Sequence, residues 1–292
     1  MIEHKPLKVA IASGKGGTGK TLVATNLAGW LSRYQDVLLV DLDVEEPDDH
    51  LFIKGTLVAN VDHKRMIPVW DEADCTHCGL CHTICKYNAI IKLGSELAIF
   101  DKLCHSCYAC SELCPAGALP MQSRKTGEVR RITAERLIFI EGQLDIGEEQ
   151  AVPLIIQTQK IAGLDTVHIP IQFFDCPPGT SCPVIAAVKN MDFVILVAEP
   201  TPFGLHDLKL AVRTMRLLQK PFGVVINRDG IGNGDVESYC IDEQIALITK
   251  IPFDREIARC YSRGELVYNR VGPMSLSLSE IINFLTRRLA VR

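Results

Sequence analysis

The sequence lacks three features that would place it outside the cell interior or on a charged surface. No apolar run approaches the ~20 residues that a membrane-spanning helix needs. Lys and Arg total 31 against 35 Asp and Glu, a formal net charge of −4, so we expect no bulk attraction to nucleic acid or anionic lipid. The short polar start, Met1 to Pro6, does not have the charged and apolar regions of a secretory leader. We therefore expect a cytoplasmic protein that binds neither nucleic acid nor, stably, a membrane.

A disulfide framework is also excluded, although the chain contains twelve cysteines. Such frameworks belong to small secreted domains, whereas this chain has 292 residues and we do not expect it to be secreted. Eight of the cysteines are spaced like metal ligands. Reduced thiolates that hold metal are therefore the better interpretation.

Apolar runs that alternate with helical patterns indicate the fold class. Leu7–Ala12 is a short apolar run, a Gly-rich turn follows, and Lys20–Arg33 has the apolar spacing of a helix. Further apolar runs of strand length are Val37–Val40, Ile169–Phe174, Phe193–Ala198 and Phe222–Ile226. Continuous apolar strands between helices predict an α/β protein with a doubly wound, mostly parallel sheet.

A Cys-rich stretch interrupts this pattern. We expect a first segment of the α/β domain at residues 1–64, a small inserted α+β domain at 65–123, and a second α/β segment at 124–292. The chain therefore predicts one large domain that carries a smaller one within it.

A Gly-rich loop follows the first apolar run. It fits G-x-x-x-x-G-K-[ST] and lies between a predicted strand and a predicted helix, the context this motif requires. Its residues are Gly14, Lys15, Gly16, Gly17, Thr18, Gly19, Lys20 and Thr21. Backbone N–H groups of such a loop bind phosphate oxygens. We expect Lys20 to reach the β- and γ-phosphates of ATP, and Thr21 to ligate Mg²⁺.

Lys15 is an additional lysine in this loop. With it, SGKGGTGKT resembles the deviant Walker A motif of the MinD–ParA–Mrp family of SIMIBI-class P-loop ATPases, to which the nitrogenase iron protein also belongs. The resemblance implies a Mg²⁺-dependent ATPase that binds ATP and ADP and forms an ATP-dependent homodimer. It also implies that Lys15 contacts the nucleotide of the partner subunit.

Other motifs match the same family in order along the chain. Asp43, in Asp41-Leu42-Asp43, resembles the switch I residue that orients the attacking water, and Asp175 resembles the Walker B residue that holds Mg²⁺. Asn227 matches the residue that contacts adenine, and Pro252 and Asp254 resemble the loop that borders the base. An Asp at a strand end is also a common helix cap, and this alternative stays open for Asp254.

The pattern Cys-x2-Cys-x2-Cys-x3-Cys occurs twice, with a constant offset of 29 residues between the two copies. A uniform offset is typical of a duplicated half-module, and the pattern resembles bacterial two-cluster ferredoxins. The resemblance implies two [4Fe–4S] clusters, each completed by the fourth cysteine of the other copy. One cluster would take Cys75, Cys78, Cys81 and Cys114, and the other Cys104, Cys107, Cys110 and Cys85. Zinc is the chemical alternative, because zinc sites made of four cysteines also use Cys-x2-Cys pairs.

Cys182 is a further candidate redox residue. It lies seven residues after Asp175, a spacing at which the nitrogenase iron protein has a cluster ligand. That cluster bridges a dimer and needs a second cysteine per subunit, but none lies between Cys114 and Cys176. We therefore do not expect a complete bridging cluster.

Three functions compete at this stage. The first is ATP-gated electron transfer to an unidentified redox protein. The second is assembly or delivery of an iron–sulfur or other metal cofactor to an unidentified acceptor. The third is positioning, as in MinD and ParA, whose membrane form usually needs a basic amphipathic tail. The apolar stripe of Ser277–Arg292 favours packing on the core instead.

Overall fold

The computed structural model describes residues 5–164 and 166–289 and divides the chain into two compact units. The first unit contains Met1–Val61, Val129–Gln143 and Ala151–Arg292, and the second contains Asp62–Glu128 and Leu144–Gln150. Arg292, the last residue of the expected tail helix, lies outside the described residues.

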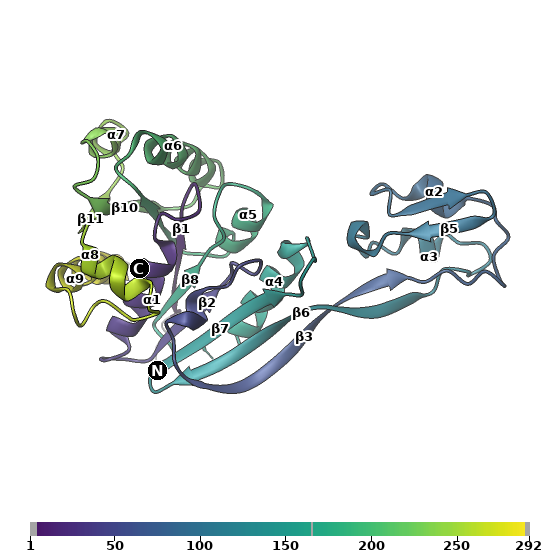
Figure 1. Cartoon of the computed structure of the whole chain (residues 1–292), viewed down its shortest axis with the longest axis horizontal. Coiled ribbons are helices and arrows are strands. Elements are labelled where there is room, and N and C mark those ends of the chain that lie inside the picture. The colour runs from purple at the N-terminus through teal and green to yellow at the C-terminus, as the bar shows by residue number, and fades with distance from the viewer. Residues whose placement is uncertain (1–4, 165, 290–292) are drawn as a thin grey trace. The chain divides into compact units, whose positions relative to one another are not determined.

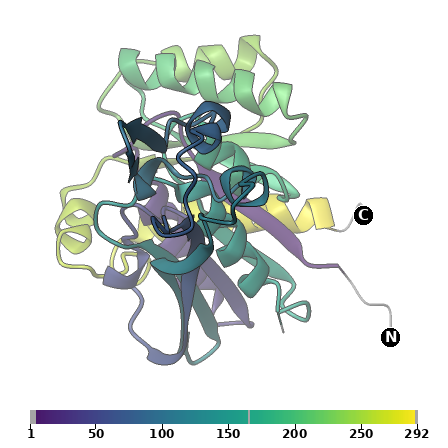
Figure 2. The same cartoon turned by 90° about the vertical axis from the view of Figure 1, so that its right-hand side faces the viewer.

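The first unit is built on a large sheet with the strand order β11-β10-β9-β1-β8-β2-β7-β6-β3, of which β3 and β6 continue into the residues of the second unit. The pairs from β11 through to β7 are parallel, whereas β6 and β7 are joined by two residues and form a hairpin. Figure 1 and Figure 2 show β1, in purple, among strands that come much later in the chain. The strands are β1 (Leu7–Ala12), β2 (Val37–Asp41), β3 (Thr56–Pro68), β6 (Met121–Ala134), β7 (Leu137–Leu144), β8 (Ile171–Asp175), β9 (Phe193–Ala198), β10 (Phe222–Asp229) and β11 (Leu247–Pro252).

Helices of the first unit pack on this sheet and on one another. α1 and α9 contact each other, and α4 contacts α5 while α6 contacts α7. Every residue of β2, β8 and β9 is buried, which explains their continuous apolar sequences. The expected α/β fold with a large, mostly parallel sheet is therefore confirmed. The helices are α1 (Lys20–Leu31), η1 (Asp49–Leu51), α4 (Ala151–Ala162), α5 (Cys182–Val188), α6 (Pro202–Leu217), α7 (Asp235–Asp242), α8 (Arg255–Tyr261) and α9 (Gly272–Leu289).

Helix α9 packs its apolar face on the core, as the spacing of its residues predicts. Leu278, Ile281 and Leu285 are fully buried in one cluster with residues of α1 and the sheet. No helix among the described residues is both long enough and apolar enough to cross a bilayer.

The second unit is small and internally repeated. It contains α2 (Leu80–Ile84), the antiparallel pair β4 (Ile90–Leu93) and β5 (Glu96–Ile99), η2 (Asp101–Leu103) and α3 (Ala109–Glu112). Helices α2 and α3 begin 29 residues apart. Three pairs of residues with positive φ keep the same offset: His77 and Ser106, Gly79 and Tyr108, Asn88 and Gly117. The sequence duplication is therefore also a duplication of backbone conformation.

The boundary of this unit differs from the expected range of 65–123, because Leu144–Gln150 folds with it. The buried Arg65 guanidinium lies 3.1 Å from the Glu148 carboxylate and donates to the Cys104 carbonyl at 3.0 Å. Gln150 donates to the same carbonyl at 2.9 Å. These contacts join two segments far apart in sequence, and spacing alone does not predict them.

Candidate functional site

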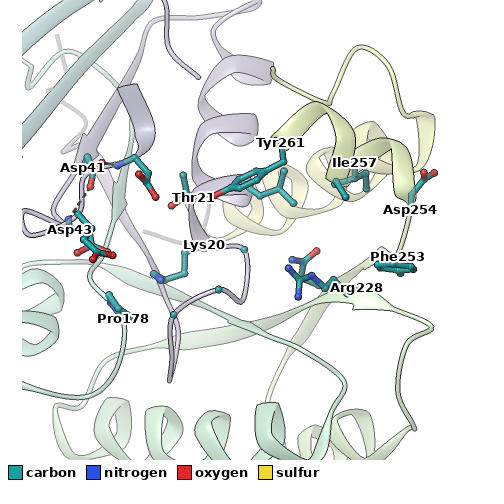
Figure 3. A pocket seen from close by; sticks show the side chains of 18 of the residues that line it. Lys20, Thr21, Asp41, Asp43, Pro178, Arg228, Phe253, Asp254, Ile257 and Tyr261 are labelled. Atoms are coloured by element: carbon teal, nitrogen blue, oxygen red, sulfur yellow. Dashed lines mark hydrogen bonds between the residues drawn. The ribbon is translucent and has the colours of Figure 1, made fainter. Parts of the chain in front are cut away.

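A cavity of about 360 Å³ lies at the carboxyl ends of the first unit's strands, beside the Gly-rich loop. Most of the sequence-predicted loop residues line it, namely Gly16, Gly17, Gly19, Lys20 and Thr21, whereas Gly14, Lys15 and Thr18 do not. Figure 3 shows Lys20, Thr21, Asp41 and Asp43 at one end and Arg228, Phe253, Asp254 and Ile257 at the other. The end with Lys20 and the carboxylates is the charged end. The other end is called the apolar end for Phe253 and Ile257, although Arg228 and Asp254 also lie there.

The loop backbone requires glycine at Gly19. Its φ of 96° is left-handed, and a Cβ there would collide with the side-chain amide of Asn227. Asn227, at the end of β10, is buried and donates to the carbonyl of Thr18 at 2.8 Å. Asn227, which is predicted to contact adenine, therefore also holds the backbone of the Gly-rich loop in place.

The charged end has the donors that a magnesium ion prefers. Thr21 Oγ1 donates to Asp175 Oδ2 at 2.7 Å. The other carboxylate oxygen of Asp175 is buried and has no hydrogen-bond partner within the described part of the chain. Asp175 itself does not line the cavity, but its carboxylate, the Thr21 hydroxyl and the Asp43 carboxylate are all oxygen donors, the kind that Mg²⁺ prefers. These residues fit the cation that accompanies a nucleotide.

Burial raises the pKa values of the carboxyls at this end. Desolvation, followed by repulsion from Asp175, raises the pKa of Asp43 to about 7 against the attraction of Lys20. Desolvation also raises the pKa of Asp175 to about 6, although Lys20 and the Thr21 hydroxyl lower it. The free site therefore holds its carboxyls partly protonated near neutral pH, and a bound cation would favour their charged forms.

Asp41 stabilises the backbone of the loop that carries Asp43. Its carboxylate accepts backbone N–H groups from Asp43 at 2.9 Å, Asp48 at 3.1 Å and Asp49 at 3.2 Å. These bonds fold the acidic loop after β2 and hold Asp43 beside the cavity.

Lys15 is placed differently from Lys20. Its ammonium lies 3.5 Å from the carboxylate of Glu199, at the end of β9, and it is one-third exposed. Glu199 also pairs with Arg228. Within its own chain, Lys15 is therefore held away from the cavity that Lys20 lines.

The apolar end contains the residues expected near the base and several that the motifs did not indicate. Asn227, Pro252 and Asp254 all line the cavity. Asp254 is also the N-cap of α8 and accepts the backbone N–H of Glu256 at 2.7 Å, so it is a helix cap whose side of the helix lines the cavity. Sequence reasoning missed Arg228, Phe253, Ile257 and Tyr261. Phe253 lies between the predicted residues Pro252 and Asp254, but the other positions depend on how β10 and α8 pack.

The second unit holds the eight motif cysteines around two cavities. Each cavity receives three cysteines from one copy of the repeat and the fourth from the other copy. Cys75, Cys78, Cys81 and Cys114 line the first cavity, and Cys85, Cys104, Cys107 and Cys110 line the second. The crosswise grouping that the motif implies is therefore present in the fold.

The donor chemistry of the cavities fits an iron–sulfur cluster. The sulfurs of Cys75 and Cys104 each accept a backbone N–H, from His77 and Ser106 at 3.4 Å, and Cys85 accepts one from Ala89 at 3.3 Å. Such bonds stabilise thiolate sulfur. Four cysteine sulfurs around one cavity are the donor set of an iron–sulfur cluster. They are equally the donor set of a zinc site.

The remaining cysteines lie apart from these cavities. Cys182 is the exposed first residue of α5 and lines neither the cysteine cavities nor the cavity beside the Gly-rich loop. Cys176, Cys240 and Cys260 are buried, as small apolar side chains would be.

Comparisons with known proteins place this geometry in a family. The septum site-determining protein MinD of Pyrococcus horikoshii, solved with Mg-ADP, superposes with a TM-score of 0.60 at 18% identity, over 97% of this chain and 98% of that one. This likeness shows the fold alone. An uncharacterised protein of Methanocaldococcus jannaschii is 30% identical over 270 residues, 89% of this chain and 92% of that protein. An iron–sulfur cluster carrier protein of Aquifex aeolicus is 25% identical over 299 residues, 94% of this chain and 66% of that protein.

The family model described as the CobQ/CobB/MinD/ParA nucleotide binding domain matches residues 9–267, which span the Gly-rich loop, Asp43, Asp175, Asn227 and Asp254. The chain therefore belongs to the CobQ/CobB/MinD/ParA family of nucleotide-binding proteins.

Proposed function

We propose that this protein is a Mg²⁺-dependent ATPase that dimerises on binding ATP and carries two [4Fe–4S] clusters, through which it passes electrons to a protein partner. One observation carries the proposal. The eight motif cysteines gather crosswise around two cavities in the same chain whose P-loop lines a third. A nucleotide switch and an electron carrier in one polypeptide suit ATP-gated electron transfer.

In the proposed ATPase site, the loop residues bind the phosphates of ATP. Backbone N–H groups and the Lys20 ammonium neutralise the phosphate oxygens, and Thr21 and Asp175 hold Mg²⁺, which supplies further neutralisation of charge. Asp43 orients the attacking water and accepts its hydrogen bond.

The proposed dimer depends on Lys15. It lies outside its own chain's cavity and is one-third exposed beside Glu199. Contact with the γ-phosphate of the partner's ATP would replace the contact with Glu199. ATP binding and dimerisation would then favour each other.

In the proposed cluster sites, the cysteines of each tetrad hold the iron atoms, and the group supplies one-electron transfer when it is bound. The chain's own contribution is to donate backbone N–H groups to sulfur and to limit the access of water. Cys81 and Cys104 are buried, while Cys78 and Cys107 are exposed and give each site an outward face for electron exchange.

The experiment compares electron transfer with and without nucleotide. Anaerobically purified protein is reduced, and the oxidation of its clusters by a one-electron acceptor dye is followed with MgATP, with MgADP and with neither. The proposal expects a rate or a reduction potential that depends on the nucleotide. Lys20→Ala should keep the clusters and lose this dependence. Equal values under all three conditions in the natural protein would refute gating.

Assembly or delivery of clusters is the second candidate, because relatives at 21% and 25% identity are named iron–sulfur cluster carrier proteins. This function needs a labile cluster, which an apo-ferredoxin acceptor would remove within the assay. Retention of all iron in the presence of the acceptor and MgATP would exclude delivery. The partly buried tetrads, each shared between two copies of the repeat, favour retention.

A further inference from the structure

The duplication in the second unit provides matched positions at which the two cysteine cavities can be compared. Lys92, at the third position of β4, lines the first cavity, and Met121, the first residue of β6, lines the second. The two residues are 29 apart, the same offset as the cysteines. The fold therefore puts a cation beside one tetrad and a neutral thioether at the equivalent place beside the other.

The charge on Lys92 is held close to its tetrad and is not balanced by a carboxylate. Its ammonium donates to the carbonyl of His77 at 2.6 Å, within the stretch that connects Cys75 and Cys78. No ion pair of Lys92 with an Asp or Glu occurs within residues 5–164 and 166–289. Its positive charge is therefore available to the first cavity.

The cation nearest the second tetrad is balanced. Arg65 donates to the carbonyl of Cys104 but also pairs with Glu148 at 3.1 Å, and Glu148 pairs with Arg124 at 2.9 Å. Arg124 in turn pairs with Asp101. Two guanidinium groups and two carboxylates make this network neutral overall.

Other features of the two cavities are nearly equal. Each tetrad has one buried, one exposed and two half-buried cysteines, and the matched cysteines Cys75 and Cys104 accept equivalent N–H bonds. In the second tetrad Cys85 accepts a further N–H bond from Ala89, which acts in the opposite direction from Lys92, and in the first tetrad Cys78 accepts a further one from Leu80. A full charge outweighs one neutral N–H group, since hydrogen bonds that involve charged groups are roughly twice as strong.

Resting on the proposed function, we propose that Lys92 gives the cluster held by Cys75, Cys78, Cys81 and Cys114 the higher reduction potential of the two. Reduction adds one negative charge to a cluster, and a nearby cation stabilises that charge. A single electron on the chain would therefore reside on the cluster held by Cys75, Cys78, Cys81 and Cys114. If it entered at the second tetrad, the electron alone would pass from that cluster to the first, with no transfer of a proton or other group.

The test is an anaerobic redox titration of the full chain, followed by the electron paramagnetic resonance of the reduced clusters. The natural protein should show two one-electron steps. Lys92→Met, which copies the second site, should lower only the upper step, and Met121→Lys, which copies the first, should raise only the lower one. We expect each substitution to shift the reduction potential of the affected step by at least about 59 mV, which is a tenfold change in the equilibrium constant of a one-electron couple.

Lys125→Met is the matched control, because it removes the same charge from the second unit at a residue that lines neither cavity. Both steps should stay where they are in this variant. Unmoved steps in Lys92→Met and Met121→Lys, with the iron content unchanged, would overturn the inference and leave the proposed function intact. A natural protein without iron and sulfide would instead remove the proposed function and the inference together.

Discussion

At the scale of single residues, the carboxyls of Asp43 and Asp175 make the nucleotide site sensitive to pH. Their pKa values of about 7 and about 6 are above the ordinary value of 3.8 because both groups are buried beside like charges. In the nucleotide-free protein each carboxyl therefore binds a proton that the unfolded chain releases above about pH 4. This contribution to stability is fully present below that pH and is lost as the pH rises through about 7.

The affinity for a Mg²⁺-nucleotide should change in the opposite direction. The cation needs ionised carboxylates, so raising the pH from about 6 to about 8 should strengthen the binding of MgADP by roughly tenfold, the equivalent of about one pKa unit. Isothermal titration calorimetry at several pH values measures this. Asp43→Asn should reduce the pH dependence. An affinity of the natural protein that does not change over this range would contradict the expectation that Asp43 and Asp175 are ionised when Mg²⁺ and nucleotide are bound.

The pair of Lys15 and Glu199 leads to a second prediction for single residues. If Lys15 must leave Glu199 to reach the partner's nucleotide, Glu199→Gln should lower the protein concentration at which the ATP-bound dimer forms. A partly exposed pair is worth about 0.5–1 kcal/mol, which corresponds to about a two- to fivefold change. Sedimentation at saturating MgATP in an Asp43→Ala background measures it. Glu237→Gln, which removes a carboxylate paired with Lys250, is the control, and a weaker dimer in Glu199→Gln would count against the exchange.

At the scale of elements, the loop between β1 and α1 depends on the conformation of one glycine. Gly19 has left-handed backbone and no room for a Cβ, whereas a Cβ at Gly16 would contact nothing within 4 Å. We expect Gly19→Ala to lower the free energy of unfolding by about 1–3 kcal/mol, and Gly16→Ala by less than about 0.5 kcal/mol.

The measurement is urea unfolding of nucleotide-free protein in a Trp70→Phe background, so that Trp30 of α1 is the only tryptophan and reports on the first unit. Equal stabilities of the two alanine variants would mean that the Gly19 backbone is not the constraint described above.

Elements that are buried on both faces could be predicted from the sequence, and elements that are exposed could not. The apolar runs Leu7–Ala12 and Phe193–Ala198 predict the bounds of β1 and β9 correctly, because both strands are buried beneath helices. The first seven residues of β3 are exposed, so its sequence does not alternate and has no strand signal. The site shows the same division. Loop glycines and cysteines are fixed by spacing, whereas Arg228 and Tyr261 reach the cavity only through the packing of β10 and α8.

At the scale of the whole molecule, both candidate sites are assembled from residues that are distant in sequence. The nucleotide cavity is assembled from residues that extend from Gly16 to Tyr261, on both sides of the second unit in the sequence. The cysteine tetrads are assembled from both copies of a repeat. Neither site can form from one segment alone.

The most direct test of this account is the metal and sulfide content of anaerobically purified protein. Two [4Fe–4S] clusters predict about eight iron and about eight acid-labile sulfide atoms per chain, with MgATP hydrolysis in the same preparation. Protein that hydrolyses ATP but contains about two zinc atoms per chain and no sulfide would contradict the central claim, because tetrahedral zinc sites would then occupy the eight thiolates.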